Sequence, residues 1–327
     1  MSKIESYTAA NNFPIKILMN PQLSNNIINR HIVPAWHLQL NPTNKCSFKC
    51  SFCSCANRNR TSEICFEDLT RFIDGKNCFS ATITGGGEPT FYSHINELVE
   101  LLKRNRCDIG LVSNGSNLQS LTKATLNNLT WCRISCSDEL PKQTNINRWF
   151  SKLEKIVGSG VKVDWAFSYV LSGEKINFEL LNAIIDFANT HKFTHVRVVS
   201  NLLKLSTAIS MPFLVRAFEH FNTDYNRVIF QGRKQFVHGQ KRCYISLLKP
   251  VISAEGQLYP CCGVQYALKN PSLDYEKSMC MGSMKDLPEL IEKQQFFDGS
   301  NCVKCFYDEY NKFIGLMLSK LDHVRFV

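Results

Sequence analysis

The alternation of hydrophobic and polar residues divides much of this chain into short strands and amphipathic helices. Runs rich in β-branched and aromatic residues predict strands at 35–40, 80–84, 107–113, 131–135, 161–170 and 194–200. Between them, stretches such as 94–104 and 178–189 repeat apolar residues at helical spacing. Strands separated by helices pair in parallel through right-handed crossovers. The pattern therefore predicts an α/β fold, a partial (β/α)6 barrel whose strand-end loops carry the functional residues.

The predicted barrel is one of four segments of the chain. Residues 1–34 form an N-terminal segment, and the barrel covers 35–201. Residues 202–242 are expected to form a helix and a basic connection, followed by a cysteine-rich extension over 243–327. Within this extension we expect a hairpin around Glu255 and Gly256 and helices near 286–296 and 303–321.

The composition is that of an ordinary globular protein, with 44% hydrophobic and 20% charged residues, which excludes a fully disordered chain. No run of 18 apolar residues occurs, so neither a membrane-spanning helix nor a membrane partner is expected. The first residues lack the charged-then-apolar order of a signal peptide, so we expect a cytoplasmic protein. The net charge of +10 favours anionic partners.

Fifteen cysteines stand out against this composition. Nine lie from Cys46 to Cys136, none between 137 and 242, and six from Cys243 to Cys305. Because disulfides are rare inside cells, two separated groups of cysteines predict two metal sites.

The first group begins in the loop after the first predicted strand, which reads NPTNKCSFKCSFCSC. Cys46, Cys50 and Cys53 have the spacing C-x3-C-x2-C, and Phe52 precedes the third cysteine. Three thiolates on one loop can bind three irons of a cubane cluster and leave the fourth iron open. Cys55 leaves a tetrahedral zinc loop as the alternative.

A glycine-rich turn, ATITGGGEPTF, ends the second predicted strand. Gly85, Gly86 and Gly87 would let a ligand approach the backbone closely, and Glu88 offers an acceptor for an ammonium group. Such a turn alone is typical of any tight connection between strand and helix. Here it comes one strand–helix unit after the cysteine loop, so both are expected at the same mouth of the barrel.

Together these two motifs resemble the radical S-adenosylmethionine (radical SAM) superfamily, in which C-x3-C-x-aromatic-C follows the first strand and a GGE-type motif the second. The resemblance covers about residues 35–201 and implies that the three cysteines ligate a [4Fe-4S] cluster. It places Phe52 near the adenine of SAM and the methionine end on Gly86, Gly87 and Glu88. Weaker matches, VSNGS and RISCSD, add Ser113, Asn114 and Ser135, the last near the ribose. Helix capping or turn formation is the alternative for these three residues.

The second group of cysteines resembles the SPASM and twitch extensions of radical SAM enzymes. A G-x4-C pattern ends the hairpin segment, and a C-x2-C pair follows later. The further cysteines of a full SPASM motif are absent, so the resemblance implies a twitch-type domain with one auxiliary [4Fe-4S] cluster. The implied ligands are Cys243, Cys261, Cys302 and Cys305, with Cys262 and Cys280 in reserve. A structural zinc ion on the same four sulfurs is the alternative.

The resemblance also implies the chemistry. One electron from the reduced cluster cleaves SAM to methionine and a 5′-deoxyadenosyl radical, which abstracts hydrogen from a substrate for oxidation or rearrangement. An electron donor such as flavodoxin or ferredoxin is then needed. The auxiliary cluster would take an electron from the product radical or bind the substrate.

The distribution of charge gives a hint about the substrate. Asp and Glu are absent from residues 6–62 and from 225–254. The first window carries the cations Lys16, Arg30, Lys45, Lys49, Arg58 and Arg60, and the second carries Arg227, Arg233, Lys234, Lys241, Arg242 and Lys249. Both windows are expected to border the mouth of the barrel. A basic rim with interleaved aromatic residues favours a phosphorylated metabolite, a nucleotide or a nucleic acid, with a merely solvated basic face as the alternative.

Three classes of function follow from these observations. The first is a radical SAM enzyme that oxidises or rearranges a small or nucleotide-like anionic molecule. The second is a radical SAM maturase that modifies a peptide or protein side chain. The third is a non-enzymatic zinc or iron–sulfur binding module.

Overall fold

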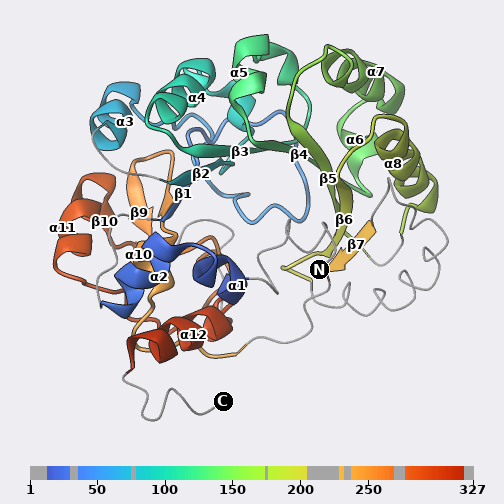
Figure 1. Ribbon diagram of the computed structural model, residues 1–327. Helices are drawn as coiled ribbons and strands as arrows, with labels where there is room; N and C mark the ends of the chain where they lie inside the picture. Colours follow the sequence, from blue (N-terminus) through green and yellow to red (C-terminus); the bar gives the residue numbers. More distant parts are fainter. Residues whose placement is uncertain are drawn as a thin grey trace.

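A curved sheet of ten strands runs through the molecule in a computed structural model (Figure 1). The structure describes residues 13–29, 36–74, 79–173, 176–204, 228–231, 237–268 and 277–319. The strand order is β10-β9-β8-β1-β2-β3-β4-β5-β6-β7. Seven of the strands, β1 to β7, are parallel to one another, as the sequence predicts for a partial barrel.

The parallel strands lie close to their predicted positions. Their bounds are β1 (His37–Leu40), β2 (Ser80–Ile83), β3 (Asp108–Ser113), β4 (Trp131–Ser137), β5 (Asp164–Leu171) and β6 (His195–Ser200). One strand was not predicted: β7 (Val228–Gln231) extends the sheet beyond β6. It lies in the segment assigned above to a helix and a basic connection, so that assignment is wrong for these four residues. The helix expected there falls outside the described residues.

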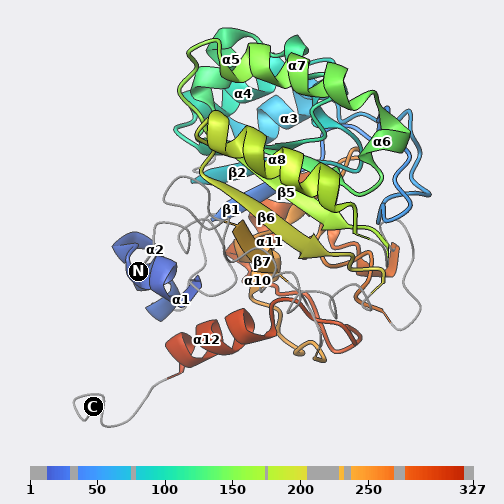
Figure 2. The same cartoon turned by 90° about the vertical axis from the view of Figure 1, so that its right-hand side faces the viewer.

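Amphipathic helices cover the outer side of the sheet. Their bounds are α3 (Phe66–Ile73), α4 (Ile95–Arg104), α5 (Lys123–Asn128), α7 (Ile146–Val157) and α8 (Phe178–Thr190). In α4 the buried residues Ile95, Leu98, Val99 and Leu102 recur at helical spacing and face the sheet. Figure 2 shows these five helices on one side of the sheet and α1 (Phe13–Leu18), α2 (Pro21–Ile28) and α12 (Asp308–Leu318) on the other. The short helix α6 (Leu140–Gln143) follows β4.

The C-terminal region continues the same sheet. The predicted hairpin is confirmed: β8 (Val251–Ile252) and β9 (Gln257–Tyr259) pair antiparallel, and Gly256 takes the positive φ of +72° that the turn requires. β8 pairs in parallel with β1, and β10 (Gly282–Ser283) pairs with β9. The remaining helices are α10 (Ile245–Leu248) and α11 (Leu287–Glu292). No helix within the described part of the chain is long and apolar enough to cross a membrane.

Candidate functional site

The carboxyl ends of β1 to β4 surround a cavity of about 280 Å³. The cysteine loop after β1, the glycine-rich turn after β2 and the ends of β3 and β4 all contribute to its wall. Sequence-predicted residues in this wall are Cys46, Cys50, Cys53, Phe52, Gly86, Gly87, Glu88, Ser113, Asn114 and Ser135. The topology therefore brings the first ligand set and all the predicted SAM-binding residues to one place.

The three cysteines of the loop are half-buried and close enough to influence one another. Burial and, after it, the neighbouring Cys53 and Cys46 together raise the pKa of Cys50 to about 12. Burial also raises the pKa of Cys46. Because like charges repel in a partly dry site, the three thiolates would coexist only beside a cationic metal group.

Two side chains donate hydrogen bonds to sulfurs of this loop. Arg58 Nη1 lies 3.2 Å from Cys53 Sγ, and Asn114 Nδ2 lies 3.7 Å from Cys46 Sγ. Arg58 is only 6% exposed, and its Nε donates to the Asn44 carbonyl at 3.1 Å. Sequence reasoning counted Arg58 only as part of a basic surface and so missed it as a neighbour of the cluster site. Its position five residues after Cys53 is the only signal that the sequence offers.

The glycines of the turn are required by the packing of two loops. A Cβ atom on Gly86 would lie 2.0 Å from Asn44 Oδ1, and one on Gly87 would lie 2.2 Å from the Lys45 carbonyl oxygen. The Gly87 amide also donates to the Thr43 carbonyl at 2.9 Å. The missing side chains thus let the turn lie directly against the loop that carries the cysteines.

Glu88 is a buried hub that joins the ends of β2 and β3. Its Oε1 accepts hydrogen bonds from the Thr90 amide (3.1 Å), Thr90 Oγ1 (2.6 Å) and Ser113 Oγ (2.8 Å). Its Oε2 accepts one from the Asn114 amide at 2.6 Å. Burial raises the pKa of Glu88, and these hydrogen bonds oppose that effect. A carboxylate oxygen has two lone pairs, and the described contacts use one of those on Oε2, so the other is left for a ligand.

Cys55, the fourth cysteine of the loop, contacts the C-terminal region. Its sulfur lies 3.5 Å from Gln265 Nε2, and its side chain is buried. Nearby, Asn44 Nδ2 donates to Glu255 Oε1 at 2.7 Å. A single zinc ion requires ligand sulfurs about 2.3 Å from the metal. In the described ranges, no three His, Cys, Asp or Glu side chains lie close enough together to hold one metal ion.

Four cysteines of the second group line one enclosed space, and two do not. The four are the predicted ligands Cys243, Cys261, Cys302 and Cys305. The space is about 30 Å³, which is too small for an organic ligand. Burial, together with neighbouring cysteines, raises the pKa of Cys302 to about 12 and that of Cys243 to about 11.

The two reserve cysteines have other contacts. Cys262 Sγ lies 3.1 Å from the hydroxyl of Tyr307, and Cys280 Sγ lies 3.3 Å from Gln257 Oε1. By contrast, Cys243 and Cys261 receive hydrogen bonds at sulfur, from Asn311 Nδ2 at 3.8 Å and from the Gly263 amide at 3.3 Å. The arrangement therefore separates the four predicted ligands from the reserves.

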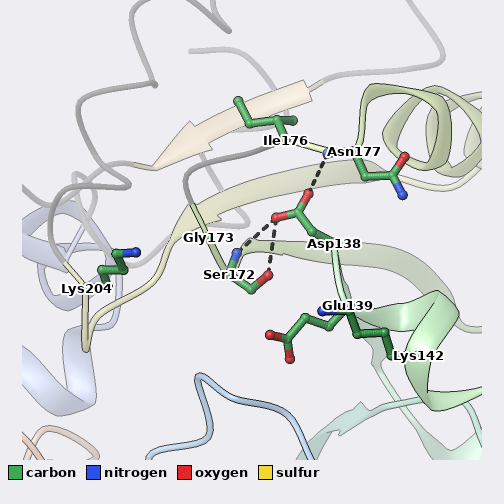
Figure 3. Close-up of a pocket in the computed structure, with 8 residues that line it drawn as sticks. All are labelled: Asp138, Glu139, Lys142, Ser172, Gly173, Ile176, Asn177 and Lys204. Carbon is green, nitrogen blue, oxygen red and sulfur yellow. Dashed lines mark hydrogen bonds between the residues drawn. The ribbon is translucent and has the colours of Figure 1, made fainter.

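A third cavity, of about 480 Å³, opens beyond the ends of β4, β5 and β6 (Figure 3). Its Asp138 carboxylate accepts hydrogen bonds from the amides of Ser172 and Asn177, each at 3.0 Å. Glu139 accepts from the Ser51 amide at 2.9 Å, and Gln143 Oε1 from the Lys49 amide at 2.8 Å. Glu139, the residue before α6, and Gln143 in α6 thus bind the backbone of the cysteine loop. Helix α6 contributes Lys142 to this cavity and Leu140 and Gln143 to the first, so it lies between them.

The predicted basic rim is only partly present as a surface. Arg58 points inward, and Lys45 forms an ion pair with Glu63 at 2.7 Å. Lys241 and Arg242 are exposed, as predicted. Lys16, Lys49 and Arg60 are exposed as well, and Lys249 is half-buried. Four further members, Arg30, Arg227, Arg233 and Lys234, lie outside the described residues.

Comparisons with known proteins agree with this architecture. The sequence model of the Radical SAM superfamily matches residues 40–179. The crystal structure of Streptococcus suis SuiB bound to S-adenosylmethionine is similar in fold, with a TM-score of 0.56, 17% identity and coverage of 84% of this chain and 74% of SuiB. SuiB bound to precursor peptide SuiA gives a TM-score of 0.55, 16% identity and coverage of 88% and 81%. The comparison with curated proteins gave no match. The predicted fold class is thereby confirmed.

Proposed function

Residues 40–179 belong to the Radical SAM superfamily, and on this premise we propose that the protein cleaves SAM reductively and removes a hydrogen atom from a small anionic substrate. The observation that carries this proposal is the shared cavity: three loop cysteines, the glycine-rich turn and the ends of β3 and β4 line one space. Their combination offers thiol ligands at one end and buried hydrogen-bonding groups at the other.

The donor set fits a [4Fe-4S] cluster with one open iron. Cys46, Cys50 and Cys53 would hold it, because three thiols on one loop leave the fourth iron without a protein ligand. When bound and reduced, the cluster supplies the electron that cleaves SAM to methionine and a 5′-deoxyadenosyl radical. Arg58 and Asn114 would stabilise the thiolates through the hydrogen bonds that already reach two of the sulfurs.

The other wall of the cavity would position SAM. Glu88 holds the turn after β2 against the end of β3, and its Oε2 is available to the SAM ammonium group. Ser113 serves this geometry by donating its hydroxyl to Glu88. Phe52 and Ser135 would contact the adenosine part of SAM.

The second set of cysteines would bind an auxiliary [4Fe-4S] cluster. Four thiols around one enclosed space, with hydrogen-bond donors at two of the sulfurs, support this assignment. A flavodoxin or ferredoxin would supply the electron that the cluster on Cys46, Cys50 and Cys53 needs to cleave SAM.

A peptide substrate is the second candidate. The specific observation in its favour is the similarity in fold to SuiB, which was crystallised with a precursor peptide, over 88% of this chain. The two substrate classes can be separated by adding small anionic metabolites or peptides to the reconstituted enzyme and measuring which set increases the formation of 5′-deoxyadenosine.

The central test is cluster assembly and SAM cleavage under anaerobic conditions. The wild type should bind roughly eight irons and, with dithionite, form 5′-deoxyadenosine, whereas a variant with Cys46, Cys50 and Cys53 changed to Ala should keep roughly four irons and form none. Cys65→Ala is the matched control, since Cys65 is exposed at the start of α3. Deoxyadenosine formation by the triple variant would refute the proposal.

A further inference from the structure

The concave face of the sheet carries a guanidinium group in strand β4. Cys132 and Ile134 are fully buried, and a Cβ on Gly115 would lie 2.9 Å from Trp149 of α7 and 3.3 Å from Ile134, which places Ile134 on the side of the outer helices. Because successive side chains of a strand alternate between faces, Trp131, Arg133 and Ser135 point the other way. Ser135 lines the cavity of the first cysteine group, so Arg133 lies on the same face, about 7 Å below it along the strand.

Arg133 is held in place, but among the described residues its Nε has no acceptor. Its guanidinium carbon lies 4.9 Å from the centre of the Trp131 ring. That ring is itself fixed on Gly110 of β3, where a Cβ would lie 2.0 Å from Trp131 Cζ2. Within the described part of the chain, the buried Arg133 Nε has no hydrogen-bond partner, and no carboxylate forms an ion pair with this side chain.

Other cationic and hydroxyl groups lie in the row of the sheet that contains Ser135, about 7 Å along the strand from Arg133, whereas Arg133 itself pairs with Ala166, which pairs with His195. In the register of the sheet, Ser135 pairs with Ser168, which pairs with Arg197 of β6. Arg197 Nη2 lies 3.4 Å from Ser168 Oγ. Burial and, after it, the charges of Arg133 and Arg197 lower the pKa of His195 to about 3, so His195 is neutral. Burial also lowers the pKa of Arg133 to about 10, which leaves it charged at neutral pH.

A buried guanidinium without an acceptor destabilises a fold unless a ligand supplies one. We propose that Arg133 binds an oxyanion of the substrate, a carboxylate or a phosphate, on the concave face beneath the SAM cavity. This assignment rests on the proposed function, because it takes that cavity as the place where hydrogen is abstracted. The planar fork of Arg matches two oxygens of either anion, and the stacking on Trp131 orients it.

The test measures anion binding by the reconstituted protein with SAM, not turnover. The midpoint of thermal unfolding is compared in phosphate, acetate and chloride at equal ionic strength, for wild type, Arg133→Gln and Arg148→Gln. Arg148 is an exposed arginine of α7 and serves as the matched control. In the wild type, phosphate or acetate should raise the midpoint by about 2 °C or more relative to chloride. The anion that does so identifies the class of substrate group.

Arg133→Gln should lose this shift, and Arg148→Gln should keep it. In chloride, Arg133→Gln should unfold at the same temperature as the wild type or higher, because an unmatched buried charge is gone. A wild type that responds equally to all three salts, or an Arg133→Gln variant that responds like the wild type, would overturn the proposal. If Arg133→Gln does not fold, Arg133→Met, which also removes the charge, replaces it, and an unchanged shift in that variant counts against the site. Formation of 5′-deoxyadenosine by the wild type is measured separately, so its failure would refute the proposed function without touching the anion response.

Discussion

Replacing Glu88 with Gln should weaken both the fold and the binding of SAM. The carboxylate accepts four hydrogen bonds of 2.6–3.1 Å from groups that are all donors in this geometry. A Gln side chain can keep one acceptor oxygen, but its amide nitrogen must then face the Asn114 amide or the donors from Thr90 and Ser113. A buried donor without a partner costs about 1–3 kcal/mol, and the remaining hydrogen bonds lose the assistance of the charge. Relief of the desolvation of the carboxylate offsets part of this loss.

We therefore expect Glu88→Gln to reduce the free energy of unfolding by about 2 kcal/mol. The measurement is anaerobic urea unfolding followed by circular dichroism, with Glu100→Gln, an exposed change on α4, as the control. SAM affinity, measured by calorimetry, should fall by about 1.5–3 kcal/mol while the iron content stays constant. Unchanged stability would show that the four hydrogen bonds are not formed. Lower stability with unchanged SAM affinity would show that Glu88 holds the two loops together but does not bind SAM.

Three further predictions concern other parts of the molecule. Arg58→Met should shift the reduction potential of the cluster on Cys46, Cys50 and Cys53 to more negative values, because a cationic hydrogen bond to a ligating sulfur is lost. A redox titration followed by EPR measures this potential. An equal shift in the exposed control Arg60→Met would contradict the prediction. Cys262→Ser and Cys280→Ser should retain the full iron content of the wild type, and a loss of about four irons in either would show that the reserve cysteine is a ligand. The pKa of His195 is about 3 in the folded protein and 6.5 in the unfolded chain, so between these values only the unfolded chain binds a proton. The free energy of unfolding should therefore be highest above pH 6.5 and decrease as the pH falls toward 3. Urea unfolding at pH 7 and pH 5.5 should therefore show a decrease of about 1.4 kcal/mol from this group, which His195→Gln should remove.

The first six strands could be predicted because each is a short apolar run between turn residues, and the helices between them repeat at helical spacing. β7 could not, because its four residues, VIFQ, are short and lie between basic residues that read as a connection. The pairing of β8 with β1 was also beyond the sequence, since the two strands are separated by most of the chain.

The candidate site shows the same division. The spacing of cysteines predicted which residues share a cavity, because three of them lie on one loop. Two partners of Glu88, Ser113 and Asn114, lie about one strand–helix unit away, and no local pattern indicates that their hydrogen-bond donors turn toward this carboxylate. Likewise, Arg133 looks like any charged residue of a strand until the register shows which face it occupies.

The pairing of β8 with β1 has a consequence for how the chain is made. Until Val251 and Ile252 leave the ribosome, β1 carries an unpaired edge beside the loop of the first cysteines. An open strand edge is a template for association with other chains. At about 5–20 residues per second, the synthesis of the intervening part takes tens of seconds. Cells that produce this protein in large amounts should therefore accumulate aggregates nucleated at His37–Leu40, and slower translation should increase them.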